Sequence, residues 1–366
     1  MKTSSIKKII AVGLTLAGVA FTPNLHATTT EADIFIEGGS ASSSVILDRS
    51  VALFGTGATI VTNGSISGNV YRLSGNSTLP AITSQNINPL VIDVNLANGA
   101  IAGLNALVSG NPGPGDTNYL GTKTVPTFVD SATSPEAVGI DSVANNIDTD
   151  YLTYVVPLVY VRNVNSIDTA PITNLTARQA VTLETSVNKT TIFGGTSTNL
   201  VYFIGRNNNS AVRTEIDLAI NNSKTIVTFT NASGGVPVQD GNPTDPGYSS
   251  ASKEVAAATA LTNSIATIAV QNLTAALVPL NFEGVPYSQT NIINGSYPLW
   301  GYEHYYNITA NLQPQQQTVL DTLYQSVTNS AWQTSSLVFS NYFVPAPWLK
   351  VKRTADGGPI IPLPNY

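Results

Sequence analysis

The chain of 366 residues contains no cysteine, one methionine and two histidines, and charged residues make up only 10% of it. Without cysteine there is neither a disulfide framework nor a thiol for lipid attachment, so a small disulfide-stapled secreted domain is excluded. Zinc sites built from histidine and cysteine are excluded as well, and we expect no metal and no cofactor. Acidic residues outnumber basic ones by 22 to 16. This balance argues against nucleic acid as a partner, because its phosphates demand a basic surface.

A long hydrophobic run occurs only near the beginning of the chain. Three lysines among the first eight residues precede an apolar stretch from Ile9 to Phe21, and the stretch Leu25-His26-Ala27 follows, which could be cleaved after Ala27. This order predicts a secretory signal over residues 1–27. The stretch is too short to span a bilayer comfortably, and no other segment approaches the length of a membrane helix. We therefore expect an exported protein, periplasmic or extracellular, that does not span a membrane.

About 339 residues remain after such a signal, which favours two domains. They carry 13 basic against 22 acidic residues, a net charge of −9. The overall field of such a protein repels anions, so an anion would have to be held by local donors.

Apolar residues at strand spacing alternate with apolar residues at helical spacing, which predicts an α/β fold. The expected strands are residues 34–36, 70–73, 90–94, 125–129, 154–161 and 265–270. The expected helices are residues 45–54, 98–108, 174–183 and 253–264. Residues 233–250 are rich in glycine, proline and serine and predict an exposed loop.

The most informative segment runs from Val201 to Ile220. It predicts a short strand, a polar loop carrying Arg206, and a helix that begins near Ser210. The free N–H groups of a helix start attract anions, and an arginine adds a full charge and a planar donor fork. The segment therefore predicts a binding site for a small oxyanion. The alternative is an ordinary strand–helix turn whose arginine is solvated.

Residues for catalysis are scarce. Beyond the signal His304 is the only histidine, and we interpret it as part of an aromatic cluster rather than a catalytic base. Glu215 and Asp217 are interpreted as solvated helix residues rather than a catalytic pair. The aromatic-rich segment 281–306 could form a platform for a ligand, but support for strands between the domains is the preferred interpretation. We therefore expect that the chain is not an enzyme.

Several segments, taken in order, resemble the phosphate-binding-protein branch of the ABC-transporter solute receptors. They are Ile34–Ser44, Val155–Val161, Asn174–Thr176, Gly205–Ser210 and Asn294–His304. The resemblance implies a type II periplasmic binding protein fold, in which two α/β lobes joined by crossing strands hold an oxyanion in a cleft. It places a first lobe at residues 28–155, a second lobe at 156–275, and a return to the first lobe with a C-terminal segment at 276–366.

The resemblance also implies ligand-binding residues, carried over position by position. They are Gly39, Ser40, Ser42 and Ser43 of the first loop, Ser131, and Arg206 and Ser210 of the arginine loop. Ala211 and Val212 stand where the family has Gly and Thr, and Ala132 replaces its aspartate unless Asp130 substitutes. The family's second loop corresponds to residues 98–103, or alternatively to 74–77.

Three classes of function follow as hypotheses. The first is capture of a small oxyanion for an ABC permease, with a phosphate-like anion as the leading candidate. The second is a cell-surface or extracellular structural protein that keeps the fold without the ligand site. The third is a hydrolase, which the scarcity of histidine disfavours.

Overall fold

The computed structural model describes residues 30–113, 116–232 and 235–364, so the predicted signal over 1–27 lies outside the described residues. Its largest element is a sheet of 12 strands. These are β1 Thr30–Gly38, β2 Ile60–Ser65, β3 Val70–Gly75, β4 Ile87–Asn95, β5 Phe128–Ser131, β6 Leu152–Asn163, β8 Asn188–Lys189, β9 Leu200–Ile204, β12 Ser264–Ala269, β13 Leu277–Pro279, β15 Trp300–Tyr306 and β16 Val344–Pro345. Their order is β2-β3-β4-β1-β5-β15-β6-β12-β9-β8, and β13 and β16 also pair with β6.

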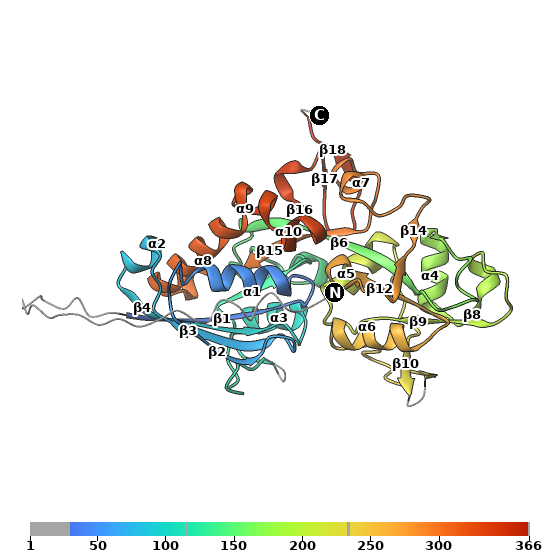
Figure 1. The fold of residues 1–366 in the computed structure, drawn as a ribbon, viewed down its shortest axis with the longest axis horizontal. Coiled ribbons are helices and arrows are strands. Elements are labelled where there is room, and N and C mark those ends of the chain that lie inside the picture. Colours follow the sequence, from blue (N-terminus) through green and yellow to red (C-terminus); the bar gives the residue numbers. More distant parts are fainter. Residues whose placement is uncertain (1–29, 114–115, 233–234, 365–366) are drawn as a thin grey trace, which may run out of the picture.

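The sheet extends through two lobes that lie side by side (Figure 1). The first lobe contains β1 to β5, and the second contains β8, β9 and β12. Strand β6 links them: Leu152–Pro157 pairs with β15, whereas Leu158–Arg162 pairs with β12. Nearly every residue of β6 is buried, as expected for a continuous apolar strand covered on both faces. The predicted strand at 154–161 is therefore confirmed, and it does cross between the lobes.

Helices cover this sheet in both lobes. They are α1 Ser43–Ala52, α2 Pro80–Thr83, α3 Ala100–Ser109, α4 Ala177–Thr185, α5 Ala211–Ala219, α6 Ala251–Ala260, α7 Gln289–Ile293, α8 Pro314–Val327, α9 Ser330–Ser335 and α10 Leu337–Tyr342. In the first lobe α3 and α8 pack on β1, and in the second α5 and α6 pack on β12. Each of the four predicted helices is present within a few residues of its expected bounds.

Two predicted elements differ from the structure. The strand expected at 125–129 begins only at Phe128, because Pro126 has no N–H to donate to a ladder. The prediction of an exposed loop at 233–250 is wrong in part. Val236–Gln239 forms β11, which pairs with β10, Phe229–Ala232. Gly235 directly precedes β11 with φ +78°, a conformation that glycine adopts without strain. The end of the segment is also structured, and Tyr248 bonds back to Gly205.

The aromatic-rich segment 281–306 lies in the core. Tyr297, Trp300, Tyr305 and Tyr306 are all at least 98% buried. Strand β15 runs between β5 and β6, so these side chains support the strands at the junction of the lobes. This arrangement agrees with the preferred interpretation of the segment as structural support.

Candidate functional site

A cavity lies between the lobes, where loops that follow several strands converge. Such positions, at the carboxyl ends of strands in open α/β sheets, are the usual ligand sites. The cavity is lined by Gly39, Ser40, Ala41, Gly99, Ala132, Arg206, Ser210, Ala211, Val212 and Glu303. Four of the residues predicted from sequence line it, namely Gly39, Ser40, Arg206 and Ser210.

The first loop connects β1 to the start of α1. Ser42 precedes α1, and its hydroxyl donates to the Gly39 carbonyl (3.1 Å) and to the Asp130 carboxyl group. Ser40 is 97% buried, lines the cavity, and its hydroxyl has no hydrogen-bond partner among the described residues. Ser43 faces elsewhere, since Gln271 of the second lobe donates to its hydroxyl (3.2 Å). The first loop therefore offers one free hydroxyl, that of Ser40.

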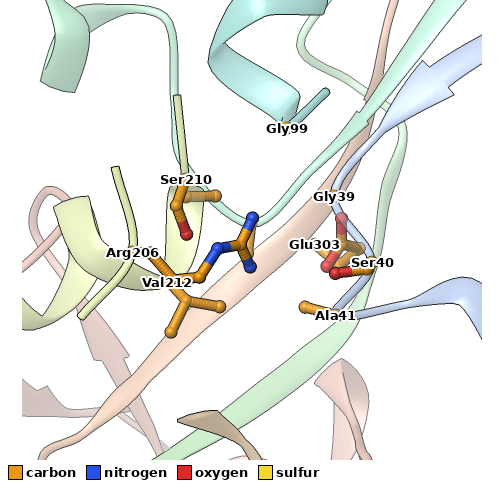
Figure 2. A pocket seen from close by; sticks show the side chains of 10 residues that line it. Gly39, Ser40, Ala41, Gly99, Arg206, Ser210, Val212 and Glu303 are labelled. Carbon is orange, nitrogen blue, oxygen red and sulfur yellow. The ribbon is translucent and has the colours of Figure 1, made fainter. Parts of the chain in front are cut away.

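Arg206 follows β9, and its guanidinium points across the cavity toward Ser40 and Glu303 (Figure 2). The side chain is fixed by the loop that sequence reasoning treated as exposed: Nε donates to the Tyr248 carbonyl (2.9 Å) and Nη2 to the Ser249 carbonyl (3.0 Å). Arg206 is 97% buried, so the alternative of a solvated arginine is wrong. Two of its five N–H groups are thus used for orientation, which leaves both N–H groups of Nη1 and one of Nη2 available to a ligand.

Ser210 has the local role that its sequence context predicts. Its hydroxyl accepts from the Arg213 N–H (3.4 Å) and caps α5. Ala211 and Val212, at the start of α5, also line the cavity, and neither side chain supplies a hydroxyl.

Ser131 does not line the cavity. Its hydroxyl donates to the Thr133 carbonyl (2.8 Å) and accepts from the Thr133 N–H (3.1 Å), which closes a tight turn after β5. The hydroxyl is thereby occupied, and Ala132 is the residue of this turn that faces the cavity.

A carboxyl group nevertheless reaches the cavity, from Glu303 on β15. This residue is 99% buried and lies next to Asp130, which β5 brings to the same place. Burial raises the pKa of Asp130 to about 7, and the hydrogen bond from Ser42 opposes that rise. Burial and the neighbouring Asp130 hold the pKa of Glu303 well above its usual value. Glu303 was not predicted as a site residue, because it lies 97 residues from Arg206 in the chain, inside a segment dominated by aromatic side chains.

A further buried carboxyl group belongs to α5. The interpretation of Glu215 as solvated is wrong, because it is 99% buried and packs against Gly301. Burial, with Asp356 nearby, holds the pKa of Glu215 well above its usual value. Asp217 does pair with Arg213 (3.3 Å) near the surface. Glu215 differs because its position on α5 faces the sheet.

His304 belongs to the aromatic cluster, as interpreted. Its ring stacks on Tyr306 with centroids 5.1 Å apart, and burial lowers its pKa to about 4. A histidine with this pKa stays neutral at physiological pH. Its contacts are those of a packed side chain.

The cavity is very small because the lobes touch each other around it. The start of α3 contacts the second lobe, where the Ile101 N–H donates to the Asn209 carbonyl (3.3 Å). Thr133 donates to the Ala211 carbonyl (3.2 Å), also from lobe to lobe. The remaining volume, about 10 Å³ for the centre of a water-sized sphere, is at the lower limit for one water molecule. Entry of a tetrahedral oxyanion would require these contacts between the lobes to open.

The fold defined by these lobes, the crossing strand and the cleft is that of the type II periplasmic binding proteins. Among solved structures, a protein from Clostridium perfringens with bound phosphate, described as a candidate phosphate ABC transporter substrate-binding protein, has a TM-score of 0.57 at 11% identity, over 86% of this chain and 100% of that one. An ABC-type phosphate transport receptor from Vibrio cholerae has a TM-score of 0.53 at 16% identity, over 86% and 100%. The periplasmic phosphate-binding protein PfluDING, bound with phosphate, reaches 0.52 at 12% identity, over 87% and 92%. These likenesses confirm the predicted fold.

Sequence comparison adds nothing to this finding. No protein-family model matches the chain, and no curated protein matches it significantly. In the described parts of the chain, no helix is long and apolar enough to cross a membrane. Among those same residues, no group of three or more acidic or histidine side chains is placed to hold a metal ion.

Proposed function

We propose that this chain is an exported solute-binding protein that captures a small oxyanion in the cleft between its lobes. A phosphate-like anion is the leading candidate for this ligand. The observation that carries the proposal is the buried Arg206 guanidinium, oriented by two backbone carbonyls and aimed at a cavity that also contains the free Ser40 hydroxyl. A preoriented arginine in a desolvated site binds a planar pair of anion oxygens more strongly than a flexible surface cation does.

The solved structures of similar fold support the proposal, since their descriptions name phosphate. Partner and location follow from the same proposal. An ABC permease would receive the ligand, and export would depend on the signal-like residues 1–27. Capture would proceed by separation of the lobes, entry of the anion, and closure around it.

The test is calorimetry of the purified protein with phosphate, sulfate and arsenate. We expect phosphate to bind to the wild type and Arg206→Ala to weaken binding roughly 10- to 100-fold, the value of one or two hydrogen bonds to a charged group. Arg206→Lys should recover only part of the loss, because lysine keeps the charge but lacks the planar donor fork that bonds to both carbonyls while it faces the ligand.

Arg178→Ala is the matched control, since it removes the same charge from the exposed surface of α4. It should leave phosphate affinity unchanged. Thermal unfolding of each variant separates lost binding from lost folding. No binding of any of the three anions by the folded wild type would refute the proposal and favour the structural role.

A further inference from the structure

The floor of the cleft contains two acidic side chains in contact with each other. Glu303 on β15 and Asp130 on β5 are both at least 99% buried, and only Glu303 lines the cavity. Their carboxyl groups lie close enough to share a hydrogen bond once one of them carries a proton. Figure 2 shows the Glu303 carboxyl group beside Ser40, on the side of the cavity that Arg206 faces.

These carboxyl groups accept few hydrogen bonds from the residues around them. One oxygen of each, Oδ1 of Asp130 and Oε2 of Glu303, has no hydrogen-bond partner among the described residues. Among the described residues, the hydrogen bond donated to the pair comes from Ser42, to Asp130. An ionised carboxylate without donors is expensive to bury, so such a pair retains protons rather than charge.

We propose that Glu303, paired with Asp130, is a proton-carrying ligand group, so that the cleft takes up a proton when it binds its oxyanion. This inference rests on the proposed function and concerns the same site. An anion placed against Glu303 would meet a second negative charge if the carboxyl were ionised. When Glu303 is neutral, its O–H can instead donate to an anion oxygen, which compensates for the hydroxyl that the Val212 side chain lacks.

Among the described residues, tyrosines make up most of the titratable groups around the pair. The titratable or charged groups that face the pair are Tyr71, Tyr154, Tyr305, Tyr306, Glu215 and Arg206. Burial raises the pKa of each tyrosine, so all four stay neutral at physiological pH. Glu215 adds to the repulsion that favours protonated carboxyls, and Arg206 offsets it only from across the cavity. The repulsion that protonation relieves is therefore the repulsion between the ionised carboxyl pair and the bound anion.

The direction of the pH effect follows from linkage. Burial raises the pKa of Asp130 to about 7 and holds the pKa of Glu303 well above its usual value, so in the free protein the pair begins to lose protons as the pH rises through about 7. A bound anion holds those protons to higher pH. Affinity should therefore fall as the pH rises above about 7, by at most about tenfold per pH unit for each proton taken up. The two carboxyls titrate as a pair, so the proton belongs to both of them.

The experiment measures proton uptake by calorimetry with inorganic phosphate, in two buffers of different ionisation enthalpy, from pH 6 to pH 9. Phosphate itself titrates in this range, so each variant is compared with the wild type under identical conditions. We expect Glu303→Gln to take up fewer protons than the wild type and to show a flatter decline of affinity with pH. Asp130→Asn removes the other carboxyl and should act in the same direction.

Glu184→Gln is the control. Glu184 is equally buried and burial raises its pKa to about 8, but it bonds to Tyr160 and Asn222 away from the cavity. It should retain the proton uptake of the wild type. Proton uptake in Glu303→Gln, or in Asp130→Asn if the former does not bind, that equals the wild-type value would overturn the inference while leaving phosphate binding intact. Absence of phosphate binding by the wild type would instead refute the proposed function.

Discussion

Replacing Trp300 by alanine is expected to lower the free energy of unfolding by about 3–5 kcal/mol, the usual cost of deleting a large aromatic side chain from a core. Trp300 is 99% buried at the start of β15. The Arg353 guanidinium lies 4.4 Å from its ring centroid, and Tyr302 packs edge-on at 5.0 Å. Truncation leaves a cavity where the central strands of the sheet meet and removes the cation–π contact. Equilibrium unfolding in urea measures the effect.

Trp348 provides the matched control for this prediction. It is the same residue type, but 46% of its surface is exposed. Trp348→Ala should cost much less than Trp300→Ala, since little apolar area returns to water. Equal losses for the two variants would show that the aromatic segment does not support the junction of the lobes.

Local features of the site could be predicted from sequence, because they depend on neighbours in the chain. The strand, the arginine loop and the cap at Ser210 all lie within twenty residues, and each has a characteristic residue pattern. The order of strands and helices also identified the α/β class. Helical spacing does predict an inner position for Glu215, since it lies four residues after Ala211 and three after Val212, both apolar.

Features that depend on distant segments were not predictable. The carbonyls that orient Arg206 lie 42 and 43 residues away, and a backbone carbonyl has no side-chain signature. Gln271 of the second lobe reaches the Ser43 hydroxyl 228 residues away, and only the folded chain shows that this hydroxyl is used. Glu303 enters the site because β15 lies between β5 and β6. The number of donors left for a ligand therefore depends on tertiary contacts.

The contact between Gly99 and Asn209 gives the second large effect. Gly99 precedes α3 with φ +93°, and a Cβ added to it would lie 2.1 Å from the Asn209 carbonyl oxygen. Gly99→Ala is expected to cost about 1–3 kcal/mol of backbone strain and a further ~1–3 kcal/mol of overpacking. The second cost can be avoided only if the lobes move apart, because the atom in the way belongs to backbone. We therefore expect a lower free energy of unfolding and a larger radius of gyration in small-angle X-ray scattering.

Gly110→Ala separates the two costs. Gly110 ends the same helix with φ +63°, but a Cβ there would meet nothing within 4 Å. This variant should show the backbone strain alone and the wild-type radius of gyration. A Gly99→Ala protein as compact as Gly110→Ala would show that this contact does not hold the cleft closed.

Ligand affinity connects this contact to function. If binding requires the closed lobes, the apparent affinity falls in proportion to the fraction of molecules that can close. Each 1.4 kcal/mol by which Gly99→Ala disfavours closure then weakens phosphate binding about tenfold, although Gly99 offers no side chain to the anion. A Gly99→Ala protein that is expanded yet binds phosphate as tightly as the wild type would mean that the anion does not require closure. A loss of affinity that accompanies the expansion would identify closure of the lobes as a step in capture.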